Sequence, residues 1–259
     1  SNFICVDAND DGVMELLVFA TGTSSENPRA ELYSFGTGKR ELIGETRLDS
    51  TITSFESIKY AKTDEGTSIY ADALCADGSS MVTEFIYWSD YYNSIISPFY
   101  SYSTGRTKET LRSSQVTCRD IDDDGYIEIP EDTSSKKQSS EITSQNWVNY
   151  GNTVLSHKCY SFSCKRDGYI LVIDDDDFSK VKANYDSESR KLTIIDKKNK
   201  SNVFEIVTLI NSNYSVNDPK YKDYTMIMKN SGFVYLAKVN KSSDIDINIQ
   251  TLKDMIKVY

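Results

Sequence analysis

Two acidic stretches with nearly the same sequence decide how this chain is interpreted. The first is Asp7-Ala8-Asn9-Asp10-Asp11-Gly12-Val13-Met14-Glu15-Leu16, and the second is Asp120-Ile121-Asp122-Asp123-Asp124-Gly125-Tyr126-Ile127-Glu128-Ile129. Both carry oxygen-bearing side chains at loop positions 1, 3 and 5, glycine at position 6 and glutamate at position 9. Oxygen ligands at alternate positions, followed by a glycine that permits a sharp turn, are typical of loops that bind Ca²⁺.

We therefore expect each stretch to bind one calcium ion. In the first loop the expected ligands are the side chains of Asp7, Asn9 and Asp11, the carbonyl of Val13, and Glu15 directly or through water. In the second loop they are Asp120, Asp122, Asp124, the carbonyl of Tyr126 and Glu128, with Glu131 as a candidate additional ligand. The alternative for each loop is a solvated, aspartate-rich turn that holds no ion.

Neither loop has the surroundings of an EF-hand, which needs a glutamate at position 12 between two amphipathic helices. The first loop has Val18 at position 12, inside a strand-like apolar run. The second loop does have Glu131 there, but residues 115–118 before it are strand-like, and the Ser/Lys-rich stretch after Pro130 lacks helical periodicity. We expect strands on both sides of each loop.

The loops mark the first and third of three predicted repeats, at about 1–50, 51–105 and 106–157. Hairpin-like segments recur at 32–43, 84–96 and 147–155. The middle repeat would have its loop at 61–66, where the glycine is kept and the first ligand is lost, so no metal is expected there. Repeats of this size suit propeller blades, but three blades do not close a ring. Further blades upstream and an open, sandwich-like stack both remain as alternatives.

The motifs D-x-N-x-D-G-x-x-E-L and D-x-D-x-D-G-x-x-E-I resemble the FG-GAP repeats (integrin-α-like, VCBS-like) of bacterial surface proteins. This resemblance covers residues 1–157 and is specific in the loops and weak in the hairpins. It implies β-propeller blades, extracellular calcium, and adhesion or the binding of carbohydrate or protein more often than catalysis. The chain departs from the family by its altered middle loop and by the lack of a plain FG…GAP stretch, which leaves the number of blades open.

The second part of the chain, 158–259, is predicted to be an α+β module. Strand-like runs occupy 169–173, 191–195, 203–207, 225–228 and 233–237, and 249–256 has helical spacing of apolar residues. An antiparallel sheet packed by a terminal helix follows, so the whole chain is predicted to be mainly β. The order of these segments faintly resembles PsbP-like domains appended to bacterial lipoproteins.

Composition excludes several classes of partner and site. The net charge of −10 and the pI near 4.7 argue against nucleic acid and against an anionic membrane surface. The sequence has no run of about 18 apolar residues, which is the length that a membrane-spanning helix needs. The chain opens inside a strand-like run at 3–6, so we expect upstream sequence with a signal peptide or lipid anchor, and a cell-surface location.

The five cysteines form no CxxC pair and there is one histidine, His157, which argues against a zinc site. Free, buried cysteines are expected. Cys5 and Cys118 both stand two residues before a loop, and we expect both to face inward.

Other polar or aromatic clusters have plainer interpretations. The run 174–177 reads as a solvated acidic turn, Asp244, Asp246 and Asn248 as a strand edge or a helix lead-in, and His157 as a surface or packed side chain. A set of aromatic residues could form a platform for sugar stacking, but core packing is the expectation. Its members are Tyr87, Trp88, Tyr91, Tyr92, Tyr100, Tyr102 and Trp147.

The function expected from these observations is a calcium-rigidified binding or adhesion module at the cell surface, without catalysis and with protein or carbohydrate as its partner. One alternative is a carbohydrate-active enzyme with paired carboxylates, for which Glu84 and Glu109 are the only candidates. The other is a purely structural envelope protein.

Overall fold

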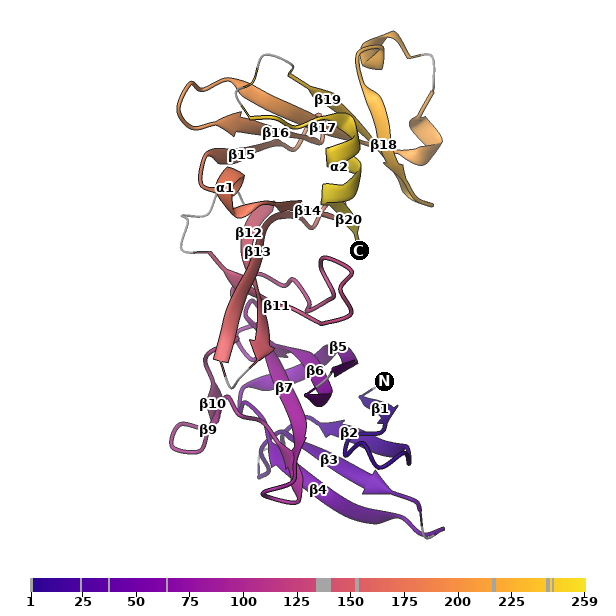
Figure 1. The fold of residues 1–259 in the computed structure, drawn as a ribbon, viewed down its shortest axis with the longest axis vertical. Coiled ribbons are helices and arrows are strands. Elements are labelled where there is room, and N and C mark those ends of the chain that lie inside the picture. The colour runs from indigo at the N-terminus through magenta and orange to yellow at the C-terminus, as the bar shows by residue number, and fades with distance from the viewer. Residues whose placement is uncertain are drawn as a thin grey trace. The chain divides into compact units, whose positions relative to one another are not determined.

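The chain forms two compact units in the computed structural model. One comprises Ser1–Asp132 and Val148–His157, and the other comprises Thr133–Trp147 and Lys158–Tyr259. The structure describes all residues except 1, 24, 37, 64, 134–140, 152–153, 216–217, 241–242 and 244. Antiparallel sheets dominate both units, which confirms the prediction of a mainly β chain (Figure 1). Among the described residues the sheets close neither a barrel nor a propeller.

The first unit opens with two four-stranded antiparallel sheets, each connected in chain order (Figure 1). The strands of the first are β1 (Phe3–Val6), β2 (Glu15–Ala20), β3 (Arg29–Ser34) and β4 (Glu41–Arg47). Those of the second are β5 (Ile52–Thr63), β6 (Gly66–Cys75), β7 (Met81–Ser89) and β8 (Ser94–Ile96). Side chains alternate across a strand, so β2 buries Glu15, Leu17 and Phe19 on one face. Both sheets contribute to one core, which includes Leu17, Leu32, Ile69, Val82 and Ile86.

The predicted middle loop is a β-hairpin in the structure. Residues 61–63 are the end of β5, Gly66 begins β6, and Thr63 pairs with Gly66 across the turn. Asp64 lies outside the described residues. Because Thr63 and Gly66 are paired ends of two long strands, these strands occupy most of the segment in which the repeat pattern predicts a loop.

The third part of the first unit contains the second acidic stretch. The short strands β9 (Tyr100–Ser101) and β10 (Arg106–Thr107) form a two-stranded sheet. An antiparallel bridge between Arg119 and Glu128 closes the stretch, and β11 (Ile129–Asp132) follows it. The next strands, β12 (Ile142–Gly151) and β13 (Val154–Cys164), carry residues of both units, which is why 133–147 belong to the second unit and not to the third predicted repeat.

The second unit is the expected antiparallel sheet with a terminal helix. Its five-stranded sheet has the order β15 (Val181–Asp186), β16 (Lys191–Asp196), β17 (Asn202–Ile210), β19 (Phe233–Val239) and β18 (Thr225–Lys229). A further sheet runs in the order β11-β12-β13-β14-β20, with β14 at Tyr169–Ile173 and β20 at Ile256–Val258. The helices are α1 (Asp175–Phe178) and α2 (Ile249–Met255), and single 3₁₀ turns occur at Asn211–Asn213 and Pro219–Tyr221.

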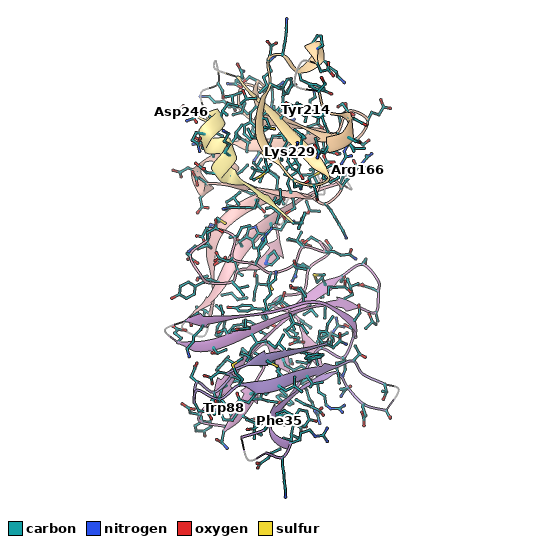
Figure 2. The ribbon with its side chains drawn as sticks, turned by 90° about the vertical axis from the view of Figure 1, so that its right-hand side faces the viewer. Phe35, Trp88, Arg166, Tyr214, Lys229 and Asp246 are labelled. Carbon is teal, nitrogen blue, oxygen red and sulfur yellow. The ribbon has the colours of Figure 1, made fainter. Side chains whose placement is uncertain are left out.

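Helix α2 explains the polar residues that precede it. Asn248 is the N-cap, and its side chain accepts the backbone N–H groups of Gln250 and Thr251, so this stretch is the helix lead-in. Asp246 lies beside this end of the helix (Figure 2), whereas Asp244 is outside the described residues. Leu252 is fully buried in the core of the unit. The helix ends one residue earlier than its apolar spacing predicts, because Ile256 pairs with Leu171 of β14.

Within the described residues no helix is both long and apolar enough to cross a membrane. All five cysteines are free, and Cys75, Cys118 and Cys164 are buried. Cys5 is exposed, so the expectation that it faces inward like Cys118 is wrong. The cause is the position of β1, which has only one neighbour in its sheet and turns Val6 inward instead.

Candidate metal-binding loops

The two acidic stretches, which we call loop 1 (7–15) and loop 2 (120–128), share an unusual backbone conformation. Position 4 has a positive φ in both, 56° at Asp10 and 64° at Asp123, and so does the glycine at position 6, 87° at Gly12 and 91° at Gly125. Aspartate tolerates the left-handed region better than most residues, and glycine enters it without strain. The sequence repeat is therefore also a repeat of backbone shape.

The first aspartate of each loop is held by the loop's own glycine. The N–H of Gly12 donates to Oδ2 of Asp7 at 3.1 Å, and the N–H of Gly125 donates to Oδ2 of Asp120 at 2.8 Å. These bonds close the loop around its first carboxylate. One oxygen of that carboxylate is thereby oriented before any ion arrives.

The aspartate at position 5 is fixed in the same way by the residue at position 7. The N–H of Val13 donates to Oδ1 of Asp11 at 2.8 Å, and that of Tyr126 donates to Oδ1 of Asp124 at 2.9 Å. Turns of this kind orient a carboxylate through its own backbone. The side chains of positions 1 and 5 are thus preorganised in both loops.

The glutamates at position 9 lie beneath the loops. Glu15 is 2% exposed and Glu128 is 0% exposed. In each case Oε2 accepts the N–H of the residue at position 2, Ala8 or Ile121, at 3.0 Å. Burial, together with repulsion from the loop aspartates, raises the pKa of Glu15. Both glutamates brace the loop from below, whereas their predicted contact with an ion, direct or through water, stays a prediction.

Three carboxylates of loop 2 lie close enough together to hold one metal ion. Asp120, Asp122 and Asp124 each offer a carboxylate oxygen, and the three oxygens lie within 4.8 Å of one another. Calcium binds oxygen at about 2.3–2.6 Å, so ligands on opposite sides of one ion are separated by roughly 5 Å. Asp122 and Asp124 are exposed, which leaves the site open to solvent. Glu131 is on β11, past the loop.

Loop 1 carries one carboxylate fewer, because Asn9 stands where loop 2 has Asp122. The Asn9 side chain contacts Asp11, with Oδ1 accepting the Asp11 N–H at 3.2 Å. Oδ1 of Asp7 is shielded from solvent and has no hydrogen-bond partner among the described residues. A shielded carboxylate oxygen without a partner is unfavourable, and a bound cation would satisfy it.

The structure adds one loop residue that the motif does not assign. Asp10, at position 4, accepts the backbone N–H of Thr67 at 3.1 Å and its hydroxyl at 3.0 Å, and it pairs with Lys62 at 2.8 Å. The hydrogen bond from Lys62 is the main cause of the lowered pKa of Asp10. These contacts fasten loop 1 to the β5–β6 hairpin. Since Thr67 is 57 residues away, no local pattern could have identified it.

Loop 2 is positioned by a buried ion pair. Asp72 of β6 and Arg112 are both fully buried, with Oδ1 and Nη2 at 2.8 Å. The other oxygen of Asp72 accepts the N–H of Cys118 at 2.9 Å, two residues before the loop begins. The side chain of Lys59 donates to the Cys118 carbonyl. The segment 115–118 that enters loop 2 is thereby tied to the second sheet. The expectation of a strand there is wrong, because the Cys118 N–H bonds to a side chain and not to a neighbouring strand.

The acids considered for catalysis do not form an accessible pair. Glu84 is 0% exposed, and its carboxylate accepts the N–H of Asp49 at 2.6 Å and hydroxyls of Ser97 and Thr107 at 2.9–3.2 Å. Glu109 is exposed and accepts the N–H of Lys108. A carboxyl group closed to solvent cannot act on a substrate in this conformation.

The aromatic residues divide between core and surface. Trp147 is fully buried and Tyr100 is 7% exposed, in line with core packing. That expectation is wrong for Tyr91, Tyr92 and Tyr102, which are 88%, 66% and 74% exposed because they lie on the turns after β7 and β9. Figure 2 shows Trp88, which belongs to the first unit together with these three tyrosines. His157 is exposed on β13, and 175–178 form the short, acidic α1.

The chain matches no protein-family model and no curated protein sequence.

Proposed function

We propose that this chain is a calcium-binding module of an extracellular, cell-surface binding or adhesion protein, and that it acts without catalysis. The observation that carries the proposal is the shared construction of loops 1 and 2, together with the three carboxylate oxygens of loop 2 within 4.8 Å of one another. The proposal includes the FG-GAP-like, blade-type arrangement of the repeats and attachment by a lipid anchor.

Calcium would act here by joining strands. In loop 1, Asp7, Asn9, Asp11 and the Val13 carbonyl lie between β1 and β2, so one ion would hold both strand ends. In loop 2 the corresponding ligands, Asp120, Asp122, Asp124 and the Tyr126 carbonyl, lie between the two halves of the Arg119–Glu128 bridge. Without the ion, several carboxylates repel one another at short range.

The charge of the loops favours an extracellular setting. Exposed sites with few carboxylates bind calcium weakly, and extracellular modules work at about 10⁻⁴–10⁻³ M. Loop 1 belongs in this class, because its expected side-chain ligands at positions 1, 3 and 5 are two aspartates and one asparagine. Such a site would fill outside a cell and stay empty in the cytosol.

Isothermal titration of the full chain with CaCl₂ tests the proposal, using the natural difference between the loops. We expect two sites. Asp122→Asn should weaken one of them by roughly tenfold, and Asn9→Asp should tighten the other by a similar factor, because affinity follows the ligand charge. Glu41→Gln is the control, since it removes a charge from an exposed position of β4 that belongs to neither loop.

A chain that takes up no calcium at several millimolar would contradict the proposal. So would uptake that is equally altered by Glu41→Gln, because binding would then follow net charge and not the loops. Titration with MgCl₂ separates calcium from divalent cations in general, since Mg²⁺ demands an octahedral site and gives up its waters reluctantly.

A further inference from the structure

A groove of about 450 Å³ lies in the first unit and includes no residue of either calcium loop. Its volume falls within the usual range of small-ligand sites, about 300–1,000 Å³. Its walls come from the connection before β3, from β3 and β4, and from the turn between β9 and β10. The lining residues are Ser25, Glu26, Asn27, Arg29, Glu45, Thr46, Arg47 and Tyr102.

Tyr102 is an exposed aromatic side chain on a turn that is held firmly. The turn is closed by the Gly105 N–H donating to the Ser101 carbonyl at 2.7 Å, and it is fastened by the Ser50 N–H donating to the Gly105 carbonyl at 2.9 Å. Nε of Arg106 donates to the buried Asp49 at 2.9 Å. The rings of Tyr102 and the buried Tyr100 meet edge to face, with centroids 5.0 Å apart. Tyr102 is still 74% exposed, so an aromatic side chain held in this way offers contact area at a low entropic cost to binding.

Three polar side chains of the groove are left without partners. Glu26 is paired with Arg29 at 3.0 Å. The side chains of Asn27, Glu45 and Arg47, by contrast, have no hydrogen-bond or ion-pair partner within the described residues. They supply an amide from the connection before β3, and an acceptor and a planar donor from β4.

The charges of the groove restrict its ligand. Two arginines, Arg29 and Arg47, face each other across β3 and β4, and two glutamates, Glu26 and Glu45, offset them. The sum is zero, which favours a neutral ligand over a phosphate, a sulfate or a polycation. The lining holds no aliphatic side chain, so a peptide would find no apolar pocket to anchor it.

We propose that this groove binds a neutral saccharide, with one sugar ring against the face of Tyr102 and its hydroxyl groups on Asn27, Glu45 and Arg47. A pyranose has an apolar face of C–H groups and neighbouring hydroxyls that both donate and accept, and this groove offers the complement of each. The inference names the ligand class of the binding module proposed above and rests on that function. The two can fail separately, because the groove and the calcium loops share no residue.

The test is binding of the full chain, in calcium, to immobilised neutral oligosaccharides of the cello, xylo, manno and galacto series, beside uronate-containing and sulfated glycans and a random peptide library. We expect retention on at least one neutral series. For that series, Tyr102→Ala should weaken binding about tenfold or more, while Tyr102→Phe, which keeps the ring, should retain most of it. Tyr91→Ala is the matched control, because Tyr91 is 88% exposed and lies outside the groove.

Circular dichroism of each variant checks that it folds. No retention on any neutral series, retention only on charged glycans or only on peptides, or a Tyr102→Ala variant that binds like the parent would each overturn the inference. Calcium uptake by Asp124→Asn and by Tyr102→Ala is measured in parallel. We expect Asp124→Asn to lose calcium uptake and Tyr102→Ala to keep it. The proposed calcium-binding function is then tested independently of saccharide binding.

Discussion

At the scale of single residues, two buried carboxyl groups show how surroundings decide ionisation. Glu84 is completely buried, and burial raises its pKa from 4.5 to about 7. Asp49 is also buried, but hydrogen bonds from Thr51, Thr107 and Arg106 outweigh burial and lower its pKa. The N–H of Asp49 donates to Glu84, so one network holds a carboxyl group whose pKa is raised and another whose pKa is lowered.

This network predicts a pH dependence that belongs to Glu84. Its folded pKa of about 7 lies above the ordinary value of 4.5, so between these values the unfolded chain releases a proton that the folded chain keeps. The contribution of Glu84 to stability therefore falls as pH rises from 4.5 to 7 and is constant above 7. In Glu84→Gln this contribution is absent, while the amide still accepts and donates within the network.

Urea unfolding of both proteins between pH 4 and 8 measures the effect. We expect the difference in unfolding free energy to change in favour of Glu84→Gln as pH rises, and then to level off. Titrating groups that do not interact with Glu84 cancel in that difference. A difference that is the same at every pH would show that Glu84 ionises alike in the folded and unfolded chains.

At the scale of elements, the stability of α2 depends on its N-cap residue, Asn248. Asn248 accepts two backbone N–H groups at 2.8 Å and 3.1 Å, and the helix has only seven residues, so a large share of its backbone groups is terminal. Asn248→Ala should lower the stability of the second unit by about 1 kcal/mol. Asn248→Asp keeps an acceptor at the same position and should be nearly neutral. Thermal unfolding of the three proteins checks this, and equal losses in Ala and Asp would show that the cap is unimportant.

The loops are also elements with partners beyond themselves. Asp10 connects loop 1 to Thr67 at the β5–β6 hairpin, and Asp72 connects β6 to the segment that enters loop 2. The central hairpin thus contacts the surroundings of both loops.

At the scale of the whole molecule, the two units should respond differently to calcium. Loops 1 and 2 both belong to the unit that contains Ser1–Asp132. At a calcium concentration of about 100 times the dissociation constant, each site should add about 2.7 kcal/mol to the stability of that unit alone. Scanning calorimetry with CaCl₂ and with chelator should show one transition that moves and one that does not.

Asn248→Ala identifies the transition of the second unit, because it should lower that one only. If calcium moves both transitions equally, or neither, the assignment of the two sites to the first unit is wrong.

Local sequence patterns predicted many of the strands and the terminal helix. The continuous apolar run of β2, the five strand-like runs after residue 168 and the helical spacing before Ile256 all predicted the elements that form. The prediction of a loop at 61–66 was wrong because its glycine, Gly66, suits a hairpin turn as well as it would suit a metal loop. The prediction that Cys5 faces inward was wrong because its register against β2 turns it outward. The spacing of residues within the loop motif carries no information about that register.

The amino-acid sequence by itself determined the two loops, since their ligands, glycines and bracing glutamates interact within ten residues of one another. Only the tertiary structure decided that Asp10 holds Thr67, that Glu84 is closed to solvent beside Asp49, and that Tyr102 stands over a polar groove with Asn27 and Arg47. The physical reason is distance along the chain. Hydrogen bonds between residues 35 or 57 positions apart depend on how the sheets pack, and packing is a property of the assembled core.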